Sequence, residues 1–344
     1  MKLRYRSAQD TLKILSSYIH RAGIARVADL SYLDSCSHLR VYSAIRPNSK
    51  SISISMGKSL DKIEAQCGAI IESIETYFAE QVVAEIIDKS QNELVRDGKA
   101  FVDINKLGYS TAISKDQKIN WCLGRTLLTN KEIFVPHVSV SLDSTMLISA
   151  LIGQNSDGIA SGSNFEEALI YSFLELIERQ SIRNHNVTEL ADVNEEEYKN
   201  LGLNNISYSF HYYQNVFNIP VIACFILNDS PLDNQVITAG YSCHFSKHEA
   251  LYKSLIEAIQ SKIGIISGAR DDLDPPCYKF NEINTLPRVS KIKYFNDMYS
   301  LDLSLNEQYQ KILEILKSHA KDLVVFTYLN EDICILKTFL IDNE

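Results

Sequence analysis

One pattern of residues occurs three times along this chain, always with the same spacing. Each copy starts with Glu-Ala and has a small residue at offset five, Glu at offset eight, Ile at offset ten and Glu or Gln at offset eleven. The copies are Glu64-Ala65 with Ala69, Glu72, Ile74 and Glu75, then Glu167-Ala168 with Ser172, Glu175, Ile177 and Glu178, and last Glu249-Ala250 with Ser254, Glu257, Ile259 and Gln260. The fold has to give all three copies the same local structure.

At about 100° per residue, a helix brings offsets zero, eight and eleven onto one stripe. The pattern therefore predicts three helices, at about residues 62–87, 164–179 and 247–263, each with an acidic stripe flanked by apolar residues. The second helix is expected to start with a capping box between Ser163 and Glu166.

Short runs of residues between the helices are typical of strands, among them 51–56, 133–136, 216–227, 236–243 and 323–326. Helices and strands alternate without the even period of a barrel, which predicts a mixed α+β (α/β) fold. The chain has 344 residues, of which 45% are hydrophobic, and no linker rich in Gly, Pro or Ser divides it. We expect a single domain over residues 1–344, and a division into two pseudo-symmetric lobes at about 1–150 and 151–344 stays open.

The balance of charge argues against several classes of partner. The 43 acidic and 34 basic residues give a net charge of −9, which repels phosphate backbones, so we expect no nucleic-acid partner. The first residues are basic but have no apolar h-region behind them, so we expect no signal peptide, and no apolar run reaches the roughly 18 residues that span a bilayer. We therefore expect a cytoplasmic protein with no membrane partner. Its seven Cys residues form no CxxC pair, so a zinc site is not indicated.

The acidic stripes have two interpretations. Glu is a good helix former, so each stripe could be a solvated face. Three matching copies, with few Lys residues at i+4, favour convergence on one site instead. Converging carboxylates need a counter-charge, and Mg²⁺ shared with the phosphates of a nucleoside triphosphate provides it. Basic residues near the stripes, namely Arg179, Lys262 and Arg270, fit phosphate too, although no P-loop or GxGxxG motif is present.

Further segments, taken with the three helices, resemble the YcaO family of ATP-dependent enzymes over most of the chain. They are Gly23-Ile24-Ala25-Arg26-Val27-Ala28-Asp29, Ala44-Ile45-Arg46-Pro47, Ser55-Met56-Gly57-Lys58 and Ser267-Gly268-Ala269-Arg270-Asp271-Asp272-Leu273. The resemblance implies a YcaO-like fold, in which the Glu-bearing helices pack on mixed sheets around a nucleotide site with ATP and Mg²⁺ as cofactors.

The same resemblance implies three sets of site residues. The metal ligands would be Glu72, Glu75, Glu175 and Glu178; the catalytic residues Glu178, Arg179, Gln260 and Arg270; and the nucleotide-binding residues Ser163, Glu167, Glu257 and Lys262. Two positions depart from the family pattern. Gly162-Ser163-Asn164 stands where the family commonly has Gly-Asn, and Lys262 stands where Arg is usual.

Family members transfer phosphate from ATP to the oxygen of a peptide backbone amide, and a nucleophile then attacks the amide carbon while phosphate leaves. A side chain of the peptide gives an azoline, external sulfide a thioamide and an amine an amidine. The chain ends in Thr338-Phe339-Leu340-Ile341-Asp342-Asn343-Glu344, without the Pro-rich tail of azoline-forming members. The resemblance thus favours, slightly, thioamidation of a ribosomally made peptide with a separate TfuA-like or E1-like partner. The alternative is a nucleotide-binding partner subunit that has lost its chemistry. Similar proteins often dimerise, which leaves a homodimer open.

An aromatic run, Tyr208, Phe210, Tyr212 and Tyr213, could bind peptide, but a sheet face is the simpler interpretation. His137 is expected to be a hydrogen-bonded core or edge residue, and Cys67 and Cys243 are expected to be packing residues.

Overall fold

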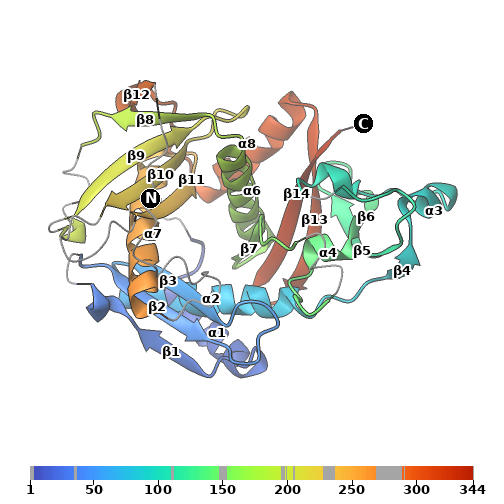
Figure 1. Ribbon diagram of the computed structural model, residues 1–344, viewed down its shortest axis with the longest axis horizontal. Helices are drawn as coiled ribbons and strands as arrows, with labels where there is room; N and C mark the ends of the chain where they lie inside the picture. The colour runs from blue at the N-terminus through green and yellow to red at the C-terminus, as the bar shows by residue number, and fades with distance from the viewer. Residues whose placement is uncertain are drawn as a thin grey trace.

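Three β-sheets and the helices between them make up the fold (Figure 1). The computed structural model describes residues 4–34, 37–109, 112–146, 153–194, 198, 200–203, 206–227, 237–268, 289 and 291–343. The helices are α1 (Ala8–Arg21), α2 (Lys62–Ala79), α3 (Gln91–Arg96), α4 (His137–Val140), α6 (Phe165–Arg183), α7 (Lys247–Ser267) and α8 (Leu305–Ser318), with 3-10 turns η1 (Ser31–Leu33), η2 (Ile104–Lys106) and η5 (Phe295–Asp297). The predicted mixed α+β class is confirmed.

The strands form one sheet of three, one of five and one of six. The first is β1 (Arg26–Asp29), β2 (Arg40–Ile45) and β3 (Ile54–Ser59). The second has the order β11 (Ile237–Cys243), β10 (Val221–Leu227), β9 (Ser207–Tyr213), β8 (Val187–Ala191) and β12 (Ile292–Tyr294), with β12 parallel to β8. The third has the order β4 (Ile86–Lys89), β5 (Ile119–Thr126), β13 (Lys321–Asn330), β14 (Cys334–Asp342) and β7 (Ile159–Gly162), with β6 (Glu132–Pro136) paired to β5. The described pairs other than β8 with β12 are antiparallel.

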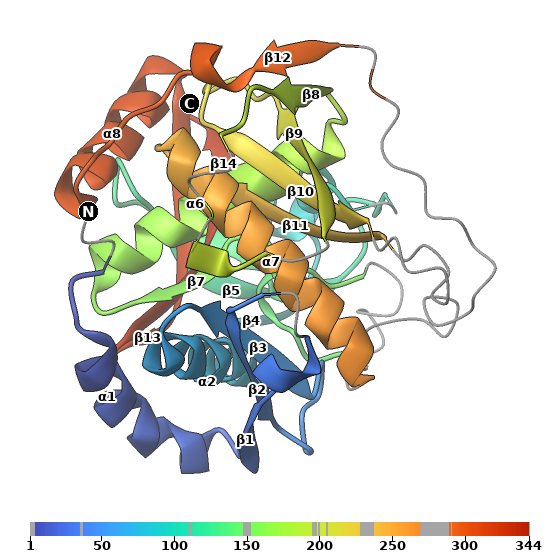
Figure 2. The ribbon, with the colours of Figure 1, turned by 90° about the vertical axis from the view of Figure 1, so that its left-hand side faces the viewer.

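Each copy of the repeated pattern lies in a helix that follows a strand, and we call the strand and its helix one unit. The units are β3 with α2, β7 with α6 and β11 with α7, and each helix packs on the strand before it. Each of these strands stands at the edge of a different sheet. In addition, α2 contacts β7, α6 contacts β11 and α7 contacts β3, so the three units close into a ring (Figures 1 and 2).

Glycines in the three strands let the helices approach closely. A Cβ on Gly57 would lie 2.2 Å from the Ala65 carbonyl oxygen, and one on Gly240 would lie 2.2 Å from the Ala258 nitrogen. Gly162 has a similar contact, 2.4 Å from the Ala168 nitrogen. The small residues at offset five, Ala69, Ser172 and Ser254, are fully buried. The alanine and small-residue positions of the pattern therefore make the contact between helix and strand.

One predicted helix end and one predicted capping box are wrong. The helix expected at residues 62–87 ends at Ala79, because the apolar residues that follow enter the six-stranded sheet as β4. The second helix has Asn164 as its N-cap, whose side chain accepts from the Glu167 backbone, so the box between Ser163 and Glu166 does not form. The shift leaves Ser163 outside the helix.

Arg46, which lies in one of the segments similar to YcaO proteins, has a structural role. Its guanidinium donates to the buried Glu80 carboxylate at 2.6 Å, and both side chains are almost fully buried. Ser49 and Ser51 also donate to this carboxylate. Burial opposes ionisation of Glu80, but the hydrogen bonds from Arg46 and the two serines outweigh it and lower the pKa. The cluster ties the turn after β2 to the end of α2.

Among the described helices, none is long and apolar enough to cross a membrane. His137 is buried and its ring Nε2 lies 3.0 Å from the Val82 carbonyl oxygen, so the prediction of a hydrogen-bonded core residue is confirmed. Phe210 and Tyr212 are buried against α7, as the sheet-face interpretation predicts.

Replacing Gly240 with Ala should destabilise the protein by about 3 kcal/mol or more, because the new Cβ would overlap the backbone of α7. The matched control is Gly98→Ala. Gly98 has a φ of 64° and nothing within 4 Å of an added Cβ, so only backbone strain of about 1 kcal/mol is expected. Urea unfolding measures both, and equal losses would contradict the close-approach argument.

Candidate functional site

Five carboxylates from all three helices of the ring face one another. They are Glu72, Glu75, Glu175, Glu178 and Glu257, which occupy offsets eight and eleven of the pattern. The charge of Glu72 acts on Glu75, those of Glu178 and Glu75 act on Glu175, and that of Glu257 acts on Glu178. Because Glu178 is only 8% exposed and the others are partly buried, this stripe is not a solvated face.

Backbone N–H groups of the edge strands hold several of these side chains in place. The Met56 N–H of β3 donates to Glu72 Oε2 at 2.9 Å. Glu75 accepts from Ser161 of β7, the strand of the next unit, and Glu178 accepts from Cys243 of β11 in the same way. The carboxylates at offset eleven thus connect one unit of the ring to the next.

We call each connection between one unit and the next a joint of the ring. The third joint differs from the other two. Its residue at offset eleven is Gln260, and its side-chain Oε1 is buried without a hydrogen-bond partner in the part of the chain that the structure describes. An amide cannot carry the charge of a third Glu, so this residue adds no further negative charge to the cluster.

Burial and mutual repulsion shift the ionisation of this cluster. Burial, more than any other cause, raises the pKa of Glu75 to about 7, and the charge of Glu72 adds to it. Burial followed by the charge of Glu257 raises the pKa of Glu178 to about 7. The pKa of Glu175 is raised well above its usual value, again chiefly by burial. The protein itself therefore leaves these carboxylates under-compensated.

Basic side chains also lie beside the carboxylates. Arg179 Nε lies 3.7 Å from Glu178 Oε1, and Lys58 Nζ, from β3, lies 3.1 Å from Glu257 Oε2. Burial tends to lower the pKa of Arg179, but the surrounding carboxylates outweigh it and raise the value. The charge of Arg4 also acts on Glu75, and Lys337 and Glu175 act on each other. The pKa values of Glu75, Glu175 and Glu178 nevertheless stay raised, so the site favours a further cation.

A cavity of about 770 Å³ adjoins the cluster. Helix residues at offsets zero, four and seven line it, and these are Glu64, Gly68 and Ile71 of α2, Glu167 and Tyr171 of α6, and Glu249, Lys253 and Ile256 of α7. Ser163 also lines it, and its backbone N–H donates to Glu167 Oε2 at 3.0 Å. The cavity and the carboxylate cluster are thus neighbouring stripes of the same helices.

Arg4 enters the cavity from the N-terminal segment. Its Nη1 donates to Glu167 Oε1 at 3.1 Å, and its guanidinium lies 4.0 Å from the centre of the Tyr171 ring. On the facing helix, burial lowers the pKa of Lys253 to about 8. Arg4, Lys58, Tyr171 and Lys253 were not among the predicted site residues. The signal for Tyr171 and Lys253 was their shared offset of four in the repeat, whereas only the folded chain brings Arg4 here.

Lys262 is not brought to the cluster, and a second predicted residue, Arg270, cannot be compared. Lys262 is buried and its Nζ lies 3.3 Å from Asp34 Oδ1, so its charge has a protein partner. Its assignment to the nucleotide stays a prediction. Arg270 lies outside the described residues.

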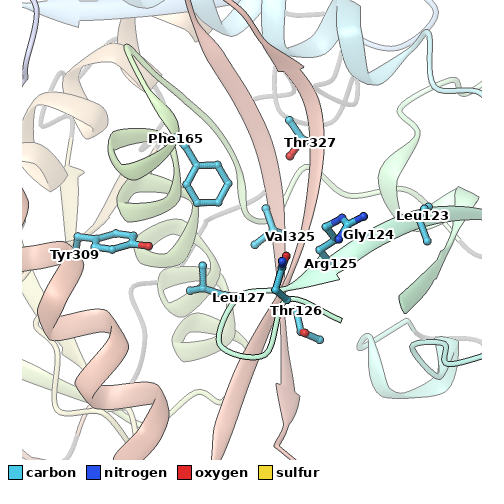
Figure 3. Close-up of a pocket in the computed structure, with 10 residues that line it drawn as sticks. Leu123, Gly124, Arg125, Thr126, Leu127, Phe165, Tyr309, Val325 and Thr327 are labelled. Carbon is cyan, nitrogen blue, oxygen red and sulfur yellow. The ribbon is translucent and has the colours of Figure 1, made fainter. Parts of the chain in front are cut away.

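A second cavity, of about 490 Å³, lies between β5, β13 and the start of α6 (Figure 3). Phe165 and Tyr309 lie at one end of it and Leu123 at the other, with Leu127 and Val325 between them. No carboxylate of the cluster lines this cavity, and Arg125 at its edge is paired with Glu132 at 2.9 Å. Its lining mixes apolar side chains with Arg125, Thr126, Asn130 and Thr327, and it contains no carboxylate that could bind Mg²⁺.

The donor set of the cluster fits Mg²⁺ shared with phosphate. Among the described residues, no three His, Cys, Asp or Glu side chains lie close enough together to hold an ion on their own. Mg²⁺ does not need such a cage, because it usually takes one or two carboxylates and completes its shell with phosphate oxygens and water. Glu72 with Glu75, and Glu175 with Glu178, offer such pairs on adjacent turns of two helices.

Comparison with known families and sequences gives a match to one family and to several relatives. A family model described as YcaO cyclodehydratase, ATP- and Mg²⁺-binding, matches residues 56–337. An uncharacterised protein of Mycobacterium tuberculosis strain H37Rv is 26% identical over 311 residues, which cover 84% of this chain and 68% of that protein. An uncharacterised protein of Rhizobium leguminosarum bv. trifolii, named for its place in the tfuA 3′ region, is 25% identical over 293 residues, covering 78% and 69%.

Solved structures agree on the fold. A heterocyclase in complex with substrate and cofactor matches with a TM-score of 0.77 at 15% identity, over 98% of this chain and 52% of its own. This chain therefore spans about half the length of that protein. YcaO from Methanopyrus kandleri, bound with AMPPCP and Mg²⁺, matches with a TM-score of 0.72 at 18% identity, over 98% and 91% of the two chains.

Glu75→Gln should stabilise the metal-free protein. The folded-state pKa of Glu75 is raised, so its ionisation costs stability as the pH rises from about 4.5 towards 7, and Gln removes that cost. We expect a gain of about 2 kcal/mol at pH 8 in EDTA, shrinking to nothing below pH 4.5. Urea unfolding at several pH values measures it, with Glu166→Gln on the exposed start of α6 as control. A pH-independent difference would argue against repulsion.

Proposed function

The chain belongs to the YcaO family, and on that premise we propose that it uses ATP and Mg²⁺ to phosphorylate the oxygen of a peptide backbone amide. The substrate is a ribosomally made peptide or a protein. The observation that carries this proposal is the convergence of Glu72, Glu75, Glu175, Glu178 and Glu257 beside a cavity large enough for a nucleotide.

The cavity supplies contacts suited to a nucleotide. Tyr171 offers an aromatic face, while Arg4 and Lys253 supply positive charge for phosphates. Glu167 orients Arg4 and is itself held by Ser163. The triphosphate would then extend from these residues towards the carboxylate cluster.

At the reacting end, the chain's own residues provide charge and orientation. When Mg²⁺ is bound with ATP, its positive charge compensates the carboxylates and stabilises the transferred phosphoryl group. Glu75 and Glu178 keep their orientation through backbone bonds to β7 and β11. In this proposal Arg179, which has Glu178 and Glu175 as neighbours, contacts the phosphoryl oxygens, and the partly buried setting limits attack by water.

The alternative function is a nucleotide-binding subunit without chemistry. Ser163 and Lys262, which depart from the family pattern, have protein partners of their own, Glu167 and Asp34. The carboxylates and Arg179 assigned to the site are retained. This retention supports an active enzyme over the alternative.

For the product we favour a thioamide made with a separate TfuA-like partner, and an azoline made with an E1-like partner is the alternative. The relative from the tfuA 3′ region of Rhizobium leguminosarum supports the first. Cytoplasmic location, a single domain over residues 1–344 and the division of catalytic and binding roles among the site residues are parts of the same proposal.

Glu178→Gln should lower ATP turnover at least about a hundredfold, because the neutral amide cannot share a cation with Glu175. Phosphate release with Mg²⁺, candidate peptide and partner measures it. The control is Glu166→Gln, a neutralisation on the same helix outside the cluster, which should keep wild-type turnover. Wild-type turnover in Glu178→Gln would remove the proposed site. Binding of Mg·ATP without phosphate release under every condition would favour the subunit without chemistry.

Incubating the enzyme with ATP, a Cys-containing peptide and sulfide separates the products. We expect a mass gain equal to exchange of oxygen for sulfur, only when a TfuA-like partner is present. Loss of one water from the peptide without sulfide would identify an azoline instead. Mass spectrometry of the peptide makes the measurement.

A further inference from the structure

The free edge of β11 starts at the carboxylate cluster. Within the described residues, β11 pairs with β10 and has no strand on its other side. The His244 N–H donates to the Pro220 carbonyl, towards β10, whereas the Cys243 N–H donates to Glu178 on the opposite side. Backbone groups alternate in direction along a strand, so those of Tyr241 and Ala239 also point to the free edge.

This edge leads away from the reacting end of the site. The Tyr241 ring lies near the charges of Arg179, Glu257 and Glu178, as their effect on its pKa indicates. The next outward residue, Ala239, lies about 7 Å farther along the strand. Both residues are partly buried and pack at the margin of the core. The strand that carries them, β11, contacts α6.

A cluster of aromatic rings lies behind the edge, and Tyr241 is its partly exposed member. The centre of the Tyr241 ring lies 6.2 Å from those of Tyr213 and Phe225, and the His211 ring lies 5.0 Å from Phe225. These rings stand on the face of the five-stranded sheet opposite α7. Phe225, Tyr213 and His211 are buried, so Tyr241 is the ring of this cluster that alternate side chains of an added strand would meet.

We propose that the free edge of β11, at Tyr241 and Ala239, binds the acceptor peptide as an added strand and leads its reacting amide to Arg179. The inference rests on the proposed function and specifies how its substrate is held. A sheet edge recognises main-chain donors and acceptors rather than particular side chains. Such recognition suits an enzyme whose reacting group is a backbone amide, and it keeps that amide in an extended, fixed register.

Ala239→Pro tests the edge selectively. Proline removes the N–H that points outward and leaves the ladder bonds to β10, which come from the alternate residues. The matched control is Ala239→Val, which keeps the N–H and favours a strand. The probe is a fluorescent synthetic peptide of alternating Thr and Val with a central Cys, measured by anisotropy with Mg²⁺ and a non-hydrolysable ATP analogue.

We expect Ala239→Pro to weaken peptide binding at least about tenfold and Ala239→Val to bind like the wild type. A second peptide, N-methylated at alternate residues, should lose binding to the wild type by a similar factor, and this arm does not depend on the folding of a variant. Equal binding of the peptide by the wild type and both variants would overturn the proposal. So would equal binding of the plain and the N-methylated peptide to the wild type, or no binding of the plain peptide to the wild type.

Two further readouts separate the possible failures. The thermal shift caused by Mg·ATP should be the same in Ala239→Pro and the wild type, and its absence from the wild type would count against the proposed function instead. Gel filtration should show no change of oligomeric state in Ala239→Pro. A change would mean that this edge pairs with a second copy of the chain and would overturn peptide binding there.

Discussion

The central constraint on this fold is that it holds negatively charged side chains close together. Five carboxylates from α2, α6 and α7 share one region, and burial with mutual repulsion raises the pKa of Glu75, Glu175 and Glu178. Such an arrangement lowers the stability of the unliganded fold, and it persists because the surrounding ring fixes the three helices. The same repulsion becomes favourable once a divalent cation enters, so the strain in the fold and the affinity of the site have one origin.

The ring that holds the charges is built from one unit used three times. In each unit a glycine of the strand and small residues of the helix bring the two backbones together, and Gly57 with Ala65 is the clearest case. This contact uses one face of the helix, and offsets zero, four, seven, eight and eleven remain for the cavity and the cluster. Each edge strand in turn offers its outward N–H groups to carboxylates, as Met56 does to Glu72 and Cys243 does to Glu178.

Threefold repetition of the unit does not make the three units equivalent. The first two close their joints with Glu75 and Glu178, whereas the third has Gln260, whose oxygen has no partner among the described residues. The cations are unequal as well, since Lys58 of the first unit pairs with Glu257 of the third. An asymmetric ligand such as a nucleotide with one reacting phosphoryl group needs this inequality, and the proposed acceptor edge lies beside the second joint.

The sequence alone determined the repeat, the helices that carry it, the mixed α+β class and the carboxylates of the cluster, because helical periodicity is a local property. It did not determine where α2 ends: residues 82–87 keep an apolar pattern that suits a helix, and only pairing with Trp121 on β5 makes part of them a strand. Nor could spacing show that Lys262 pairs with Asp34 or that Arg4 reaches Glu167, 163 positions away. Those contacts join residues far apart in the chain, and their partners are chosen by the packing of the three units rather than by any local pattern.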